Sequence, residues 1–259
     1  MKHWRRQSHF KGLWECPDFF ELPVDGDTTN IKWVLHGGSA DYFIGSFDGK
    51  KFTAELPKLN YSERKEVNGS DVYLYAAESF SNMPDNRRVQ MAWGHGVEFT
   101  GMPFTQVMLF PTEFSLITTT EGIRLVANPI KEIDELRSTS HKWSNLTVEE
   151  ANKYLSTIKP CALDVKITFK IKQGDNLHLR YQGCEILNLS SDDVSKGDNT
   201  AEILIDNSLA EIFINHGRRY FIRNFKALHS EDGLVFDSYK YGPTINNLEI
   251  YTLKSIWNQ

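Results

Sequence analysis

The chain has 259 residues, and its 29 Lys and Arg against 34 Asp and Glu give a net charge of −5. This slightly acidic balance removes the general electrostatic case for binding nucleic acid or an anionic membrane. A hydrophobic content of 40% and a charged content of 24% exclude a disordered chain and allow one or two packed domains. Aromatic residues make up 12%, which suits β-sheet cores and surfaces that stack on sugars.

Three cysteines, Cys16, Cys161 and Cys184, allow at most one disulfide, so the sequence excludes a disulfide-stapled scaffold. No window approaches the ~18 apolar residues of a membrane span. The first ten residues include several basic side chains but no apolar region follows them, so we expect no signal peptide within this chain. The sequence alone leaves the localisation open.

Short apolar runs separated by turn residues fill the first part of the chain, which is typical of antiparallel β hairpins. Asp48-Gly49 predicts a two-residue turn, and Pro84-Asp85-Asn86 predicts the loop between two later strands. The strands predicted here are residues 32–36, 42–47, 51–53, 72–77 and 88–93.

A helical interlude is predicted next. Asn128 is a candidate N-cap, Pro129 fits the first helical position, and Ile130, Ile133 and Leu136 recur at a spacing of three. These residues predict one short helix between the hairpins and the rest of the chain.

The last part of the chain is again predicted to be β. Thr147-Val-Glu-Glu150 has capping-box spacing and predicts a short helix before it. Residues 163–172 alternate apolar and polar without a break, as in a strand with one buried and one solvated face. Further strands are predicted at residues 201–206, 211–214, 220–223 and 246–253. We expect an all-β chain with hairpins in residues 1–115 and a β-sandwich in residues 116–259.

Glu15 is the first candidate for chemistry. It lies between Trp14 and a Pro-Asp-Phe-Phe segment, and a carboxyl among apolar side chains has a raised pKa, as a general acid near neutral pH requires. The alternative interpretation is a surface carboxylate beside a turn-forming proline.

Several segments in order resemble the motifs of glycoside hydrolase family 32, the invertase, inulinase and levanase-like β-fructofuranosidases. Trp14-Glu-Cys-Pro-Asp-Phe-Phe resembles the acid-catalyst motif, and Tyr75-Ala-Ala-Glu-Ser-Phe80 with Arg87-Arg-Val-Gln-Met-Ala-Trp-Gly94 resembles a later propeller-blade motif. The remaining similar segments are residues 101–106, 109–114, 128–137 and 205–217. The resemblance implies a partial five-bladed β-propeller, made of its last blades, followed by a C-terminal β-sandwich, and no cofactor.

The family pattern also contains an Asn-Asp-Pro-Asn-Gly motif with the nucleophilic Asp and an Arg-Asp-Pro motif whose Asp stabilises the transition state. This chain contains neither motif. Retaining hydrolysis needs two carboxyl groups ~5–5.5 Å apart, and only the acid can be assigned here. We therefore expect the C-terminal part of such an enzyme, truncated or split, without the nucleophile-bearing blades.

The resemblance assigns roles to three residues. Glu15 takes the general acid/base role, Cys16 beside it orients or tunes the acid, and Trp93 borders the sugar pocket. The alternatives are a small buried thiol for Cys16 and a core indole for Trp93.

Other polar residues of the matched motifs have weaker assignments. Asp18 is expected to cap or bond backbone locally. Arg87, Arg88 and His95 are candidates for contact with outer sugar units, and a solvated turn is the favoured alternative for the two arginines. No cluster in the sequence has metal-ligand spacing, and no glycine-rich phosphate loop precedes a helix.

These residues lead to a main hypothesis and an alternative. The main hypothesis is a retaining β-fructofuranosidase that hydrolyses levan, inulin or sucrose and is incomplete without a nucleophile from another segment. The alternative is a non-catalytic carbohydrate-binding β-sandwich or an inactive fragment. The family is often secreted or periplasmic.

The number of residues also limits the propeller. A four-stranded blade takes ~40–50 residues, so residues 1–115 are expected to form two antiparallel sheets and not a closed ring. The open blade faces are then exposed apolar surface, or are covered by an N-terminal companion segment or an oligomer partner.

Overall fold

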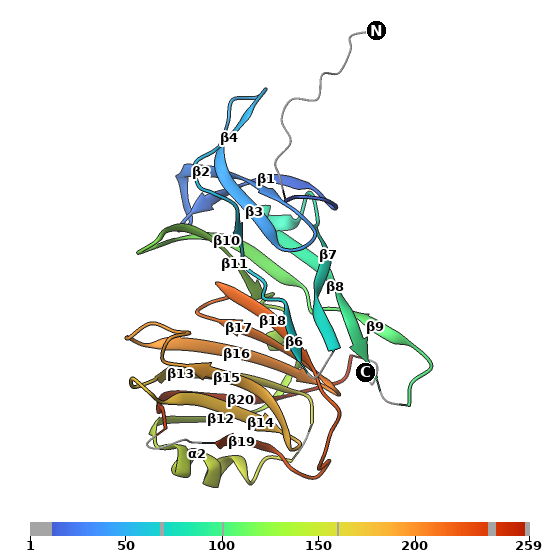
Figure 1. Cartoon of the computed structure of the whole chain (residues 1–259), viewed down its shortest axis with the longest axis vertical. Coiled ribbons are helices and arrows are strands. Elements are labelled where there is room, and N and C mark those ends of the chain that lie inside the picture. Colours follow the sequence, from blue (N-terminus) through green and yellow to red (C-terminus); the bar gives the residue numbers. More distant parts are fainter. Residues whose placement is uncertain (1–11, 68–69, 100, 160, 238–241, 257–259) are drawn as a thin grey trace.

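The computed structural model describes residues 12–67, 70–99, 101–159, 161–237 and 242–256. The first ten residues, which carry the expectation about a signal peptide, lie outside this set. In the described residues the strands form three sheets, one curled sheet above a two-sheet sandwich (Figure 1). The expected all-β architecture is confirmed. Among the described helices, none has the length and apolar composition that a membrane span requires.

The first sheet combines two antiparallel groups of strands. Its order is β4-β3-β2-β1-β10-β8-β7-β6, with β5 beside β3, β9 beside β8 and β11 beside β10. We expected two separate sheets, but β1 and β10 pair in parallel at Val24 and Leu116 and join them. The strands are β1 (Asp18–Val24), β2 (Asp27–His36), β3 (Asp41–Phe47), β4 (Phe52–Ala54), β5 (Leu59–Asn60), β6 (Lys65–Val67), β7 (Ser70–Ser79), β8 (Arg88–Glu98), β9 (Thr105–Met108), β10 (Thr112–Thr119) and β11 (Gly122–Pro129).

The predicted hairpins of this sheet are present. β3 and β4 pair through Phe47 and Phe52, so the loop between them covers residues 48–51 and is longer than the predicted two-residue turn. The Asp48 carboxylate accepts the backbone N–H of Lys50 at 2.8 Å and of Lys51 at 2.7 Å, which holds this loop. A 3-10 turn at Pro84–Asn86 connects β7 and β8.

The helix between the two parts is shorter than predicted and begins later. Asn128 does not cap it, because Asn128 pairs with Glu113 in the β10–β11 ladder. Helix α1 covers only Ile133–Leu136, with Glu132 at its N-cap and no side-chain cap. Ladder hydrogen bonds of β11 therefore override the local capping preference of Asn128.

The second part is a β-sandwich. Its larger sheet has the order β12-β20-β13-β16-β17-β18, and its smaller sheet has the order β15-β14-β19. Helix α2 (Val148–Leu155) closes one edge and carries the predicted capping box between Thr147 and Glu150. The strands are β12 (Arg137–Leu146), β13 (Leu163–Lys170), β14 (Asn176–Tyr181), β15 (Cys184–Ser190), β16 (Asn199–Asp206), β17 (Leu209–Ile214), β18 (Arg219–Asn224), β19 (Leu234–Asp237) and β20 (Thr244–Leu253).

Two apolar cores hold the molecule together, and the second one joins its parts. The sandwich core lies between the six- and three-stranded sheets. The other core combines first-sheet residues such as Phe20 and Phe114 with Leu204, Phe213 and Tyr220 from β16, β17 and β18. The outer face of these sandwich strands thus packs on the first sheet.

The division of the chain at residues 115 and 116 stays a prediction. Strand β10 begins at Thr112 and spans that position, and the first sheet continues through β11 to Pro129. Sheet hydrogen bonding shows where the sheet ends, which is a different property from where an independently folding unit ends.

Candidate active site

Glu15 lies in the segment that precedes β1, beside the loop between β2 and β3. The backbone N–H of Gly38 donates to the Glu15 carbonyl oxygen at 3.0 Å and fixes the segment against that loop. The Tyr75 phenol on β7 donates to Oε2 of the Glu15 carboxylate at 2.5 Å. This bond raises the pKa of the Tyr75 phenol, and it points the carboxylate toward β7.

The surroundings of Glu15 differ from the apolar pocket that the sequence predicts. Glu15 is exposed, and the neighbouring Trp14 side chain is 88% exposed. The apolar residues that follow in sequence point elsewhere, because strand alternation buries Phe20 beneath the sheet and leaves Phe19 on its outer face.

Irregular backbone brings β7 to Glu15. The β7–β8 register shifts between Tyr75 and Glu78, and Ala76 within this bulge has a φ of 48°. A bulge reverses the alternation, so Tyr75 and Glu78 lie on one face although they are three residues apart. Ala77 N–H donates to the Gly38 carbonyl at 3.2 Å, and this bond holds the bulge against the same loop as Glu15.

Cys16 lies at the closest approach of these segments. It has a φ of 50°, and a Cβ built on Gly38 would be 3.0 Å from the Cys16 Cβ and 3.2 Å from the Ala76 Cα. Burial raises the pKa of the Cys16 thiol, and the charge and hydrogen bond of Glu78 and the charge of Glu15 raise it further. Cys16 therefore links two carboxylates.

Trp93 faces the same region from β8. It pairs directly with Tyr75, and the two ring centroids are 6.2 Å apart. The indole Nε1–H donates to Oε1 of Gln106 at 3.1 Å, which fixes the ring plane. Tyr73 and His95 extend the row, with centroids 4.6 Å apart, and His95 lies 4.8 Å from Trp93. The structure thus brings Glu15, Cys16 and Trp93 into one region.

The other matched residues have mainly structural contacts. Asp18 accepts the backbone N–H of Ser79 at 3.1 Å and so ties β1 to the end of β7, which is a contact across 61 residues and not the local one that we expected. Arg87 forms ion pairs with Glu113 at 2.8 Å and Glu132 at 2.6 Å, unlike the solvated turn that we expected.

Arg88 also makes a contact away from the candidate site. Its guanidinium donates to the Phe80 carbonyl oxygen at 3.1 Å and lies over the Phe20 ring, 4.8 Å from the ring centroid.

Sequence analysis did not single out Tyr75 or Glu78. Both lie within a motif that it quoted, but regular alternation would place them on opposite faces. No pattern in the sequence shows the bulge. Among the residues that the structure describes, no group of three or more His, Cys, Asp or Glu side chains has the arrangement of a metal site.

Comparison with known proteins now adds to this geometry. Residues 1–129 match the model of the glycosyl hydrolases family 32 N-terminal domain, and the match ends where β11 ends. A levanase of Bacillus subtilis (strain 168) is 29% identical, with 99% of this chain and 46% of that protein covered. The chain belongs to glycoside hydrolase family 32.

A second levanase extends this similarity. The levanase of Bacillus sp. (strain L7) is 27% identical, with 96% of this chain and 32% of that protein covered. The chain therefore spans less than half the length of the two levanases.

Solved family 32 structures share the fold. Fructan 1-exohydrolase IIa from Cichorium intybus aligns with a TM-score of 0.70 at 17% identity, covering 93% of this chain and 62% of that chain. Exo-inulinase from Aspergillus awamori aligns with a TM-score of 0.67 at 20% identity, covering 94% and 57%. The prediction of a partial propeller followed by a β-sandwich is confirmed.

Proposed function

We propose that this chain carries the acid/base part of a β-fructofuranosidase-type hydrolase that acts on levan, inulin or sucrose with retention. The names of its relatives support this class, since they include levanases and exo-inulinases. The observation that carries the proposal is the hydrogen bond from Tyr75 to Glu15 beside the fixed Trp93 ring.

Glu15 is the proposed general acid and base. Its carboxyl protonates the leaving glycosidic oxygen and later takes a proton from the water that releases the sugar. The Tyr75 phenol holds the carboxylate in one orientation at 2.5 Å. Trp93 offers its ring to the apolar side of a fructofuranosyl unit, and Cys16 positions Glu15 from the next residue.

We propose that the nucleophile is an Asp supplied from outside this sequence. Retention needs a second carboxylate ~5–5.5 Å from the acid, on the other side of the anomeric carbon. An N-terminal companion segment is the proposed source, and it would also cover the outer face of β1–β4. That face carries a partly exposed aromatic cluster of Phe19, Trp33, Phe47 and Phe52, in which Phe19 and Trp33 stack at 4.6 Å.

A reducing-sugar assay with sucrose, inulin and levan tests this proposal. The chain alone is expected to release only a trace of fructose, because protonation without capture of the oxocarbenium-like centre leaves most of the barrier in place. An added N-terminal fragment with the family's two aspartate motifs is expected to restore turnover.

The Glu15→Gln variant in the same mixture is expected to lose at least ~100-fold in rate while it still binds sugar. Robust hydrolysis by the chain alone would contradict the proposal that the nucleophile comes from outside this sequence. Glu78 would then be the first carboxylate to test as the nucleophile. An active Glu15→Gln mixture would remove Glu15 from the mechanism. A mixture that binds sugar without hydrolysis in any arm would favour the non-catalytic alternative.

A further inference from the structure

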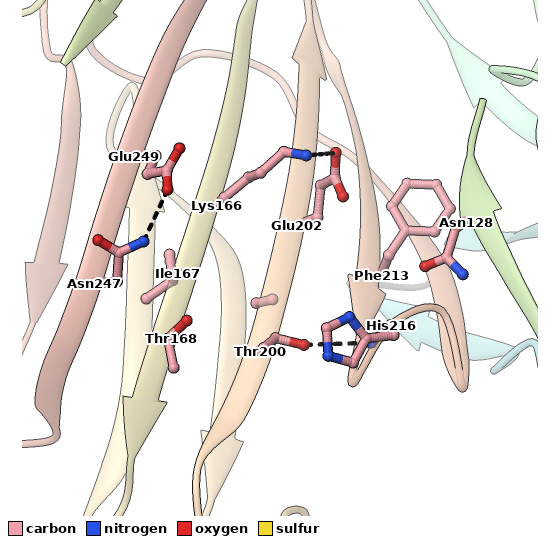
Figure 2. Close-up of a pocket in the computed structure, with 11 residues that line it drawn as sticks. Asn128, Lys166, Ile167, Thr168, Thr200, Glu202, Phe213, His216, Asn247 and Glu249 are labelled. Carbon is pink, nitrogen blue, oxygen red and sulfur yellow. Dashed lines mark hydrogen bonds and ion pairs between the residues drawn. The ribbon is translucent and has the colours of Figure 1, made fainter. Parts of the chain in front are cut away.

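A concave region that includes none of the residues around Glu15 lies on the outer face of the six-stranded sheet. This groove has a volume of about 240 Å³ and is formed by β13, β16, β17 and β20, with Asn128 of β11 on its rim (Figure 2). It lies where the first sheet meets the sandwich, and sites between structural units are frequent binding places. The volume is below the ~300 Å³ of typical drug-sized pockets, which suits one sugar unit of a chain.

Strand register arranges the groove side chains in two parallel rows. Lys166 of β13 pairs with Glu202 of β16 and with Glu249 of β20, so these form a charged row. Thr168 pairs with Thr200 and Asn247 in the same two ladders and forms a neutral row of hydroxyl and amide groups. Figure 2 shows both rows pointing into the groove.

The charges of the first row are compensated within the protein. The Lys166 ammonium lies 3.1 Å from Glu202, and Lys142 lies 2.8 Å from Glu249. Asn247 also donates to Glu249 at 2.9 Å. A ligand therefore meets a balanced polar surface, and neither an anion nor a cation finds an excess of opposite charge.

Several groups of the groove retain hydrogen-bonding capacity, and the Thr168 hydroxyl and the Asn128 amide face each other across it. In the described part of the chain, the Thr168 hydroxyl and the Asn128 amide have no side-chain hydrogen bond. The Phe213 ring of β17 borders the groove but is 1% exposed and stacks on Tyr220 with ring centroids 4.3 Å apart, so polar side chains provide the surface that a ligand meets. Hydroxyl and amide groups match the hydroxyl groups of a sugar, which both donate and accept hydrogen bonds.

A strained turn holds the rim in place. Asn215, His216 and Gly217 between β17 and β18 all have positive φ, at 50°, 57° and 73°. Ala127 N–H donates to the Gly217 carbonyl at 3.0 Å, and a Cβ on Gly217 would be 2.0 Å from the Ala127 oxygen. The turn is thus locked to β11, which keeps His216 and the adjacent Asn128 on one edge of the groove. Strain maintained by surrounding contacts is a feature of functional sites.

We propose that this groove binds one unit of a neutral oligosaccharide through Thr168 and Asn128, separately from the site at Glu15. That the oligosaccharide is a fructan rests on the proposed function. Bound there, a polymer would stay attached to the protein between cleavage events and raise its local concentration.

Methyl NMR of the whole chain tests the proposal directly. Threonine methyl groups and tryptophan indoles are labelled, and an inulin-type fructo-oligosaccharide of four units is titrated in, with a malto-oligosaccharide of equal length in parallel. The methyl signals of Thr168 and Thr200 are expected to shift with the fructan. In the wild-type chain the Trp93 indole signal reports the other site. The two threonine signals are expected to shift equally in a Trp93→Ala variant, in which that site has lost its ring.

A matched set of variants measures the contribution of the two groups. Thr168→Val with Asn128→Ala is expected to weaken this binding about thirtyfold, since two hydrogen bonds of ~1 kcal/mol each are lost. Thr53→Val on the exposed strand β4 is the control and is expected to change nothing. Calorimetry of binding gives the affinities.

If the Thr168 and Thr200 methyl signals do not shift when the fructan has saturated the Trp93 signal, the proposal that the groove binds sugar is wrong. The proposed function at Glu15 is then unaffected. Shifts with the malto-oligosaccharide alone would overturn the fructan class. If the reconstituted enzyme hydrolyses no substrate while the fructan still shifts the Thr168 and Thr200 signals, the proposed function is wrong. The proposal that the groove binds sugar then stands.

Discussion

The Glu15 site and the sandwich groove reach their arrangements by opposite means. Around Glu15 the backbone departs from regular geometry at Cys16 and Ala76, and the β7 bulge turns Tyr75 and Glu78 onto one face. In the groove, the ladders of β20, β13 and β16 keep a regular register from Lys166 to Thr168, with a shift against β20 only after Thr168, and align side chains that are far apart in sequence. Irregular backbone concentrates groups at a point, and regular register spreads them along a row. The first arrangement suits chemistry on one bond and the second suits holding a chain.

The largest expected effect is a loss of unfolding free energy, and it differs between a glycine of the groove rim and a glycine of the Glu15 site. Gly217→Ala places a Cβ 2.0 Å from the Ala127 oxygen at a φ of +73°, so we expect a loss of about 4 kcal/mol from overpacking and backbone strain together. Gly38→Ala places its new Cβ 3.0 Å from the Cys16 Cβ, and we expect the unfolding free energy to fall by about 2 kcal/mol. Urea unfolding measures both free energies.

Gly49→Ala is the control for the backbone conformation alone. Gly49 has a φ of +87° and no atom lies within 4 Å of a Cβ built on it, so we expect Gly49→Ala to lower the unfolding free energy by only about 1 kcal/mol. Equal losses in Gly217→Ala and Gly49→Ala would show that the contact with β11 does not hold the groove rim.

The second prediction concerns the joint between the two regions. The buried Glu211 carboxylate on β17 accepts the backbone N–H of Phe110 at 2.9 Å and the phenol of Tyr220. Burial raises the Glu211 pKa from 4.5 to about 7. The folded protein therefore holds a proton that the unfolded chain releases. This stabilisation is complete below about pH 4.5 and is lost as the pH rises through about 7, by roughly 3 kcal/mol.

Glu211→Gln is expected to remove this decline between pH 4.5 and 7, since the amide keeps an acceptor and cannot ionise. Unfolding free energies across that pH range give the measurement. Glu98→Gln, which replaces an exposed carboxylate, is expected to leave the pH profile unchanged. A profile that Glu211→Gln leaves intact would place the titrating group elsewhere.

The sequence predicted the parts of the molecule that depend on local pattern. Alternation in residues 163–172 predicted the strand that the structure has as β13, and its apolar positions Val165, Ile167 and Phe169 are buried on one face. Asn128 was misjudged as a cap because its partner Glu113 belongs to another strand. The Glu15 site could be recognised from its motif, but the contact with Tyr75 requires the bulge. The groove could not be predicted, since it depends on the relative register of residues 32 and 79 positions apart in the sequence, Thr200 and Asn247 against Thr168.

The third prediction compares the stability contributions of two polar side chains, the helix-capping Thr147 and Asn128 on the groove rim. Thr147→Ala removes the reciprocal bonds with Glu150 and is expected to lower the unfolding free energy by about 1 kcal/mol. Asn128→Ala is expected to change it by less than about 0.5 kcal/mol, because only its backbone is used in the ladder. Thermal or urea unfolding of the two variants provides the test. A larger loss in Asn128→Ala would show that this side chain supports the fold and not the groove.

The smallest effect concerns the link between the two carboxylates at the Glu15 site. The charge and hydrogen bond of Glu78 contribute to the raised pKa of the Cys16 thiol, after burial. Glu78→Gln removes the charge, so the thiol pKa falls and more thiolate is present at a given pH. We expect the alkylation of Cys16 by iodoacetamide at mildly alkaline pH to become about threefold faster, because the thiolate is the reacting form. Peptide mass spectrometry follows Cys16 separately, and the exposed Cys161 in the same molecule serves as the internal control.

Glu21→Gln, which replaces an exposed carboxylate on β1, is the matched variant and is expected to leave the alkylation rate of Cys16 unchanged. An unchanged Cys16 rate in Glu78→Gln would mean that the bulge does not bring this carboxylate to the thiol, and the region would then hold one acidic group where the structure places two.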